Sequence, residues 1–317
     1  MQTQVCCLPQ FVVIPALAFP SFGIPPITFW IYVSASVVFI VGLIKIIGEL
    51  PQLRGVDKIM PLGRLFFAIP LAVFGSEHFT ATANVASLVP RWIPAHTFWV
   101  YLTGLAFICA AVSIVALVQA RLAAALVGMT FLIFVIVMDM PGVVAQPGNR
   151  FVWALALRQL AFSGGAFAFA LSPWSTRLRQ PLPARPAWSS FPRFFIGIPS
   201  IFYGVEHFLH PEYVPAIPLQ KLTPDWIPGR IFLSYFVGVI LILAGVCLLA
   251  NKKTLLAATA LGLTILLTVL WIYLPMLLVA PTDVVVLNFF FDTLLFCGAV
   301  LLLANAMDKE RLRRIVY

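Results

Sequence analysis

Ionisable side chains within apolar segments are the residues of this chain most able to do chemistry. Placing such a group in hydrocarbon is costly, so each one is a candidate functional residue. The candidates form two similar sets, Glu77, His78, Asp139 and Arg158 in the first half and Glu206, His207, Tyr273 and Asp292 in the second. Tyr273 stands at the position that matches Asp139, and Asp292 matches Arg158. These eight residues are the predicted ligand-binding residues.

The two Glu-His pairs are expected at the outer level of a membrane. Glu77 follows the cytoplasmic residue Arg64 by 13 residues, which is roughly 20 Å along a helix. Asp139 is predicted to end its helix on the same side. Arg158 and Asp292 are predicted about two turns below the outer ends of their helices. All the candidates would therefore converge on one level.

Three interpretations of these residues remain open. In a structural role, each glutamate accepts hydrogen bonds from the following turn or pairs with Arg158, and Arg158 pairs with Asp292. In a binding role, the histidines and glutamates bind and deprotonate a quinol, because histidine titrates near neutrality. A third role, ligation of haem or a metal by two histidines, is disfavoured because CxxCH and HExxH motifs and thiolate clusters are missing. No cofactor is evident, and a quinone is compatible with the residues.

Two Trp-Ile-Pro segments precede predicted helices. Tryptophan favours the membrane interface, and proline is tolerated in the first turn of a helix. Trp92 with Pro94, and Trp226 with Pro228, are therefore expected to anchor helix starts. The alternative is that they form a lid over the Glu-His site.

Composition places these residues in a membrane protein. The chain has 317 residues, of which 62% are hydrophobic and 10% charged, against about 25% charged in a typical soluble domain. A span needs about 20 mostly apolar residues. Nine segments qualify, so we predict an all-α polytopic protein with helices near 27–50, 64–83, 96–119, 121–140, 150–172, 192–210, 230–250, 254–278 and 284–306.

The basic residues predict the orientation. Fifteen of the 20 lysines and arginines fall in one alternate set of loops and flanks, and such residues concentrate on the cytoplasmic side. This distribution predicts an external N-terminus and a cytoplasmic C-terminus. The net charge of +9 therefore reflects topology, and no nucleic-acid partner is expected. Residues 1–26 contain no lysine or arginine, which argues against a cleavable signal peptide.

The chain contains an internal repeat. Residues 64–79 match 193–208 at eight of sixteen positions, and residues 90–104 match 224–238 at seven of fifteen. The offset rises from 129 to 134 because 209–223 holds five extra residues. Each copy has four helices, so both enter the membrane in the same sense and are expected to be related by a pseudo-twofold axis along the membrane normal. The predicted units are 1–60 with a leading helix, 61–172 and 193–306 as four-helix units, a linker at 173–192 on the anionic lipid surface, and a basic tail at 307–317.

The cysteines predict no disulfide framework. Cys109, Cys247 and Cys297 lie within apolar segments and are expected to be buried free thiols. Cys6 and Cys7 are adjacent, and adjacent cysteines rarely pair with each other, so no role is assigned to them.

The unit resembles the DoxX-like family of bacterial membrane proteins. The resemblance rests on G-x-E-H-F in the first helix, P-x-W-I-P before the second and LAFSGGAFAFA at the end of the fourth, and it covers 64–172 and 193–306. It implies a redox-associated membrane subunit that binds a quinone-like molecule, with a partner oxidoreductase and the residues Glu77, His78, Glu206 and His207. Family members usually have one unit, so this chain resembles a fused dimer in which one composite site is retained. The alternatives are a transporter that rocks its two repeats and a scaffold without a ligand.

Overall fold

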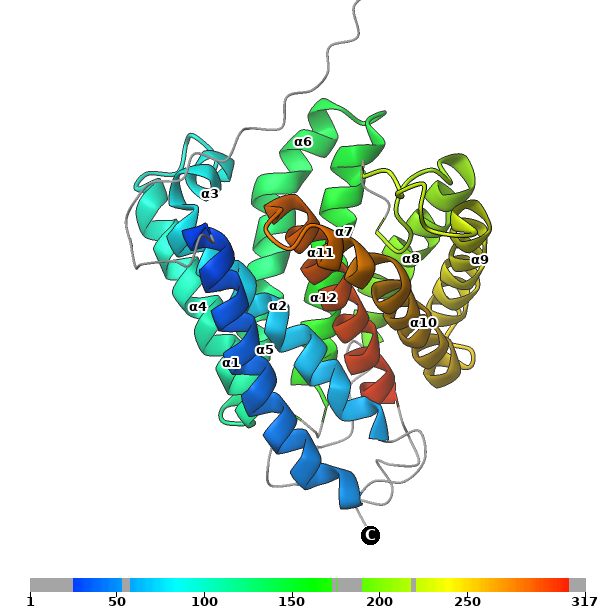
Figure 1. Cartoon of the computed structure of the whole chain (residues 1–317), viewed down its shortest axis with the longest axis horizontal. Coiled ribbons are helices and arrows are strands. Elements are labelled where there is room, and N and C mark those ends of the chain that lie inside the picture. Colours follow the sequence, from blue (N-terminus) through cyan, green and yellow to red (C-terminus); the bar gives the residue numbers. More distant parts are fainter. Residues whose placement is uncertain (1–24, 53–57, 173–174, 176–189, 218–220, 308–317) are drawn as a thin grey trace, which may run out of the picture.

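The computed structural model describes residues 25–52, 58–172, 175, 190–217 and 221–307, and every regular element in these ranges is a helix (Figure 1). Extended pairing among them is limited to one isolated bridge between Tyr213 and Leu222. Cys6, Cys7, most of the linker and the basic tail lie outside the described residues. The chain is an all-helical, multi-pass membrane protein.

Seven helical segments of the described chain are long and apolar enough to cross a membrane. They are α1 (Pro26–Glu49), α4 (His96–Ala116), α5 to α6 (Ala120–Ala145), α7 (Arg150–Ala170), α9 (Arg230–Leu249), α10 to α11 (Thr254–Val279) and α12 (Val284–Met307). An eighth results if the bent pair α2 and α3 is taken as one span. The other predicted segment is helix α8 (Pro192–Leu209), whose polar residues Arg193, Glu206 and His207 lower its hydropathy.

The first predicted helix of the repeat, 64–83, has different bounds in the structure. Helix α2 spans Met60–Thr80, and the chain then bends by 101° into the short helix α3 (Thr82–Leu88). At the bend, the Thr82 hydroxyl donates hydrogen bonds to the carbonyls of His78 and Phe79. A side chain that bonds nearby carbonyls competes with continuation of the helix. The separate short helix α3 was not predicted by the apolar pattern.

The helix predicted at 121–140 is wrong at its end, because Asp139 does not terminate it. Helix α5 (Ala120–Phe134) continues through a π-helical turn, η3 (Val135–Asp139), into α6 (Met140–Ala145). A proline in mid-helix lacks an amide proton and clashes with the preceding turn, and the wider π turn before Pro141 accommodates it. In the second half, α10 (Thr254–Thr268), η6 (Val269–Tyr273) and α11 (Leu274–Val279) repeat this arrangement before Pro275.

The two halves meet through α7 and α12, which lie in the middle of the molecule (Figure 1). Helix α7 packs on α8, and α12 packs on α2, so the last helix of each half contacts the first helix of the other. Gly164 lies against Phe195 and Ile196, and Gly298 lies against Phe66 and Phe67. Small residues permit such close helix approach in membranes. The interface therefore repeats the same contacts at corresponding positions.

Glycine pairs also bring the first two helices of each half together. Gly75 of α2 lies against the carbonyl of Gly104 in α4, and Gly204 of α8 lies against that of Gly238 in α9. A side chain at Gly104 would meet Cβ of His78, 2.7 Å away. The glycine contact therefore fixes how closely the histidine-bearing helix approaches its neighbour.

The leading helix α1 packs mainly against helices of the first half. It packs on α2 and α4, and an ion pair of 2.9 Å joins Glu49 near its end to Arg64 of α2. Near its start, the Tyr32 hydroxyl donates to the carbonyl of Pro281, 2.7 Å away. Helix α1 thus ties the first half to the loop before α12.

The three cysteines of the described helices are free thiols, as predicted. Only Cys297 is buried, however, and Cys109 lies at the surface of α4. The prediction that Cys109 is buried is wrong, because the apolar face that carries it points away from the protein.

Candidate ligand-binding cavity

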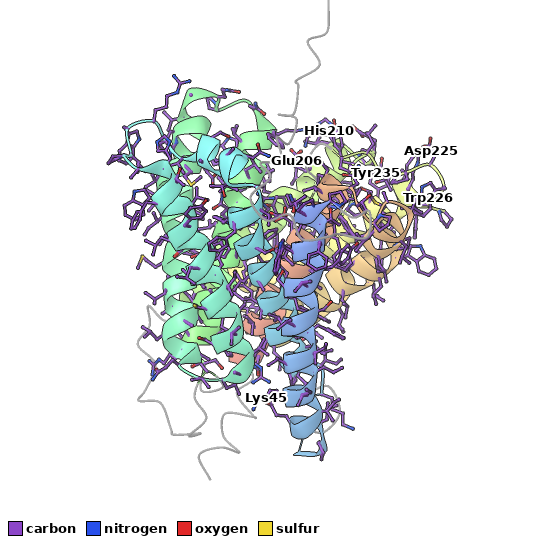
Figure 2. All side chains as sticks on the ribbon, turned by 60° about the vertical axis from the view of Figure 1, so that its left-hand side comes forward. Lys45, Glu206, His210, Asp225, Trp226 and Tyr235 are labelled. Atoms are coloured by element: carbon purple, nitrogen blue, oxygen red, sulfur yellow. The ribbon has the colours of Figure 1, made fainter. Side chains whose placement is uncertain are left out.

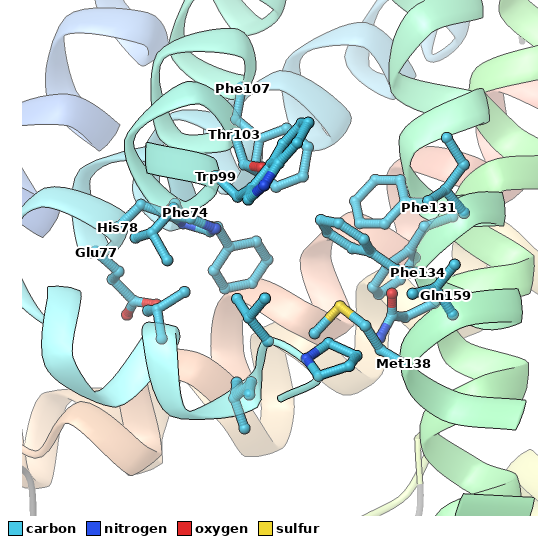
Figure 3. A pocket seen from close by; sticks show the side chains of 18 of the residues that line it. Phe74, Glu77, His78, Trp99, Thr103, Phe107, Phe131, Phe134, Met138 and Gln159 are labelled. Atoms are coloured by element: carbon cyan, nitrogen blue, oxygen red, sulfur yellow. The ribbon is translucent and has the colours of Figure 1, made fainter. Parts of the chain in front are cut away.

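A cavity of about 940 Å³ lies within the first half (Figure 3). Helices α2, α3, α4, α5, α7 and α12 and the turn η3 contribute to its wall. Apolar residues dominate the lining, and among them are the aromatic side chains of Phe74, Trp99, Phe107, Phe131 and Phe134. Ligand sites are typically apolar cavities of roughly 300–1,000 Å³ with a few convergent polar groups. This cavity has the size and lining of such a site.

Polar atoms without partners gather at this cavity. Four buried side-chain atoms of its lining find no hydrogen-bond partner in the structure: Glu77 Oε1, Arg158 Nε, Gln159 Oε1 and Asn288 Oδ1. Figure 3 shows Glu77 and Gln159 on opposite sides of the space. A buried polar atom left unpaired costs about 1–3 kcal/mol. A bound molecule with matching polar groups would remove these costs.

The hydrogen bond of His78 determines what its ring presents. Nδ1 lies 2.7 Å from the carbonyl oxygen of Phe74. A carbonyl can only accept, so Nδ1 carries the proton and Nε2 of the neutral ring is an acceptor. Nε2 has no partner among the described residues. His78 thus offers the cavity one acceptor nitrogen.

Arg158 and Asp292 form the ion pair that the sequence predicted. Both line the cavity, and they are the matching fourth-helix residues of the two halves. The guanidinium is therefore engaged by a carboxylate through Nη1, and its buried Nε has no partner in the described part of the chain. Glu77 is the remaining carboxyl group of the lining, and no cation neutralises it in the described chain.

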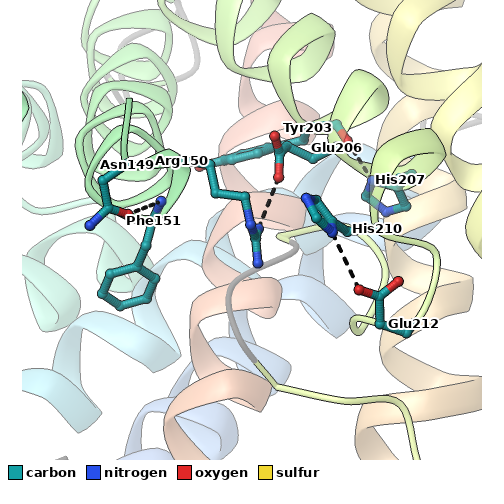
Figure 4. A network of polar contacts seen from close by, with 8 residues as sticks. All are labelled: Asn149, Arg150, Phe151, Tyr203, Glu206, His207, His210 and Glu212. Atoms are coloured by element: carbon teal, nitrogen blue, oxygen red, sulfur yellow. Dashed lines mark hydrogen bonds and ion pairs between the residues drawn. The ribbon is translucent and has the colours of Figure 1, made fainter. Parts of the chain in front are cut away.

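The corresponding residues of the second half are satisfied within the protein (Figure 4). Glu206 forms an ion pair of 2.9 Å with Arg150, whose guanidinium lies 4.5 Å from the ring centre of Tyr213. Nδ1 of His207 donates to the carbonyl of Tyr203, and Nε2 accepts from the amide of Ala216, 2.9 Å away.

Tyr273 is also satisfied in this way. Its hydroxyl donates to the carbonyl of Pro215 at 2.6 Å. The loop after α8 therefore supplies partners to both Tyr273 and His207.

Two sequence differences account for this asymmetry. The residue that corresponds to Arg150 is Val284, so Glu77 lacks the cation that Glu206 has. The connection after the first helix is also five residues longer in the second half. Its residues Val214, Ala216 and Ile217 are fully buried. In the first half, α3 takes the corresponding place and contributes Val85 and Leu88 to the cavity lining.

The structure therefore separates the predicted candidates. The cavity brings together Glu77, His78, Arg158, Asp292, Trp92 and Pro94. Glu206, His207 and Tyr273 belong to the second cluster, and Trp226 and Pro228 do not line the cavity. Asp139 lies in the π turn outside the lining, with a buried Oδ2 that lacks a partner. Groups of three or more histidine, cysteine or acidic side chains able to hold a metal are not found among the described residues.

The predicted pairing of each glutamate with Arg158 or with the following turn is wrong. Arg158 is occupied by Asp292, Glu206 pairs with Arg150, and Oε1 of Glu77 has no partner. The sequence interpretation also missed Gln159 and Asn288. The only sequence signal for them is an uncharged amide side chain within an apolar helix. Such a residue indicates a functional site less strongly than a charged residue does, because burying it in hydrocarbon costs less.

The two histidines are expected to differ in their contribution to stability. His207→Ala removes the acceptor for the buried Ala216 amide and should lower the free energy of unfolding by roughly 1–3 kcal/mol. His78→Ala removes only one hydrogen bond, which lies within its own helix, and should lower the free energy of unfolding by about 1 kcal/mol or less. Thermal unfolding of both variants in detergent measures the difference. Equal losses would contradict the assignment of His207 as a structural residue.

Comparison with known proteins gives one family match. A family model described as a domain of unknown function (DUF8561) matches residues 67–160, which run from α2 into α7. This segment includes Glu77, His78, Trp92, Asp139 and Arg158. No curated protein and no solved structure is significantly similar to the chain.

Proposed function

We propose that this chain is a nine-span, DoxX-like membrane protein that binds a small amphipathic, quinone-type molecule in the cavity of its first half. The observation that carries the proposal is the set of unpaired polar atoms at an otherwise apolar cavity. In this proposal the ring lies among the aromatic side chains, and its oxygens face Glu77 and His78. The chain supplies the binding site, and a partner oxidoreductase supplies the electron carrier.

Recurring contacts support a tandem duplication. Arg158 pairs with its own counterpart Asp292, and Gly165 lies against its counterpart Ala299. Ser163 donates to the carbonyl of Gly128, and Cys297 donates to that of Gly262, both at positions 134 residues apart. Contacts between equivalent residues are expected near a twofold axis. The proposal counts α2 and α8, which occupy equivalent places, as the two further spans.

The distribution of polar groups supports the proposed orientation. Figure 2 shows Lys45 at one end of the molecule and Glu206, His210, Asp225 and Trp226 at the other. With the lysine- and arginine-rich end in the cytoplasm, the cavity opens toward the outer half of a bacterial inner membrane. The N-terminus is then outside and the C-terminus inside.

The two rival functions fit the structure less well. Helices α2 and α8 run without a break through Pro70 and Pro199, so neither proline creates the broken helix of many transporters. In a scaffold without a ligand, the unpaired polar atoms of the cavity would lower stability with nothing to offset the cost.

The proposal predicts a ligand that depends on the residues of this cavity. Full-length protein purified in detergent should yield a quinone or quinol in its lipid extract by mass spectrometry. We expect Glu77→Gln combined with His78→Ala to lower this yield at least about tenfold, which corresponds to about 1.4 kcal/mol. Thr103→Phe, which fills the cavity while leaving Glu77 and His78 in place, should have the same effect.

Glu206→Gln is the matched control, because Glu206 lies outside the cavity. Its yield should equal that of the unmodified protein. A wild-type extract without quinone, together with failure to bind added short-chain quinone or quinol, would refute the proposed function.

A further inference from the structure

The loop after α8 folds inward and supplies hydrogen-bond partners to polar side chains of the second half. The buried residues Val214, Ala216 and Ile217 lie beside His207 and Tyr273, which match His78 and Asp139 of the first half. Its backbone supplies a donor to His207 and an acceptor to Tyr273. In the second half, His207 therefore has both of its hydrogen-bond partners: a carbonyl acceptor for Nδ1 and an amide donor for Nε2.

In the second half, Nε2 of His207 and the carboxylate of Glu206 each accept a hydrogen bond from the protein. The amide of Ala216 donates to Nε2 of His207, and the guanidinium of Arg150 donates to the carboxylate of Glu206. Both histidines hold the same tautomer, because each donates from Nδ1 to the carbonyl four residues earlier. Nε2 of His78 and Oε1 of Glu77 therefore lack donors of the kind that their counterparts have.

We infer that the ligand of this cavity carries a head that donates hydrogen bonds to Nε2 of His78 and to Oε1 of Glu77. Resting on the proposed function, this inference means that the cavity selects the hydroquinone form over the quinone form. The two hydroxyls of a hydroquinone are donors, whereas the carbonyls of a quinone only accept.

The other polar atoms of the lining agree with this selection. Oε1 of Gln159 and Oδ1 of Asn288 are further acceptors without partners, and the guanidinium of Arg158 is held by Asp292. A head that can only accept would face these unpaired oxygens, and its donor among the buried unpaired atoms of the lining would be Nε of Arg158.

Binding of matched redox forms tests the inference. Purified full-length protein in detergent is titrated calorimetrically, under anaerobic conditions, with a decyl-substituted dimethoxy-methyl-benzoquinol and with the corresponding quinone. We expect the quinol to bind at least about tenfold more tightly. In His78→Phe, which removes the acceptor and keeps a ring, the ratio should fall toward one. His210→Ala, at an exposed histidine of the second half, should retain the full ratio.

The outcomes separate the inference from the proposed function. Equal binding of quinol and quinone overturns the inference and leaves the proposed function standing. Binding of neither overturns both. Tight binding of decylammonium without binding of the quinol overturns the inference and identifies the head as a cation. A quinol preference that persists in His78→Phe and in Glu77→Gln also overturns it.

Discussion

Replacing Arg158 with leucine is expected to lower the free energy of unfolding by about 3 kcal/mol, because it leaves the Asp292 carboxylate buried without its partner. The side chains are 19% and 12% exposed, so solvent can offset only part of the loss. Chemical denaturation in mixed micelles, followed by tryptophan fluorescence, gives the free energy. This is among the largest effects expected from one substitution outside the tightly packed glycines.

Two further variants test whether the effect comes from the pair. Arg158→Leu combined with Asp292→Leu should recover most of the lost stability, since an apolar pair can replace a buried ion pair. Exchange of the two residues, Arg158→Asp with Asp292→Arg, should also recover it if the positions are equivalent about a twofold axis. A double leucine variant no more stable than Arg158→Leu would show that the arginine acts through another contact.

Substitution of Gly298 by alanine is expected to disrupt the packing of the two halves, at a cost of about 3 kcal/mol. The added Cβ would lie 2.5 Å from the backbone nitrogen of Phe67 and 2.7 Å from the carbonyl carbon of Phe66. Backbone atoms of a packed helix cannot move aside as a flexible side chain can. Helix α12 must therefore shift away from α2, which also displaces Asp292 and the cavity wall.

Gly48→Ala provides the control for this substitution. Gly48 lies in α1 with no atom within 4 Å of an added Cβ. Alanine is the better helix former by about 1 kcal/mol, so stability should be unchanged or higher. Thermal unfolding in detergent compares the two variants. A Gly298→Ala protein as stable as Gly48→Ala would contradict the close packing of α12 on α2.

The asymmetry of the two halves has a simple physical basis. A twofold arrangement of identical units would place two equal cavities at one membrane level. Arg150 and the longer loop satisfy the polar groups of one half, and Val284 and helix α3 leave those of the other half open. In the proposed tandem duplication, divergence of this kind stabilises one half and leaves the other available for the proposed ligand.

The sequence alone determined the class of the protein and the position of its helices. Length and apolarity of each segment are local properties, so composition indicates a membrane protein wherever the segments pack. Helices lie at the predicted segments, with the main differences at the bend after Thr80 and at the π turn that ends at Asp139. The Arg158–Asp292 pair was also predictable, because matching positions of two copies approach each other near an axis.

The tertiary structure decided which candidates form a site. The two Glu-His pairs are nearly indistinguishable in sequence, because each motif carries the same residues at the same spacing. Their difference arises from groups distant in the chain: Arg150 is 56 residues from Glu206, and the buried amide of Ala216 reaches His207 only because the loop folds inward. Whether a polar atom has a partner depends on such three-dimensional contacts. Only the folded protein therefore shows that Oε1 of Glu77 and Nε2 of His78 have no partner at a cavity.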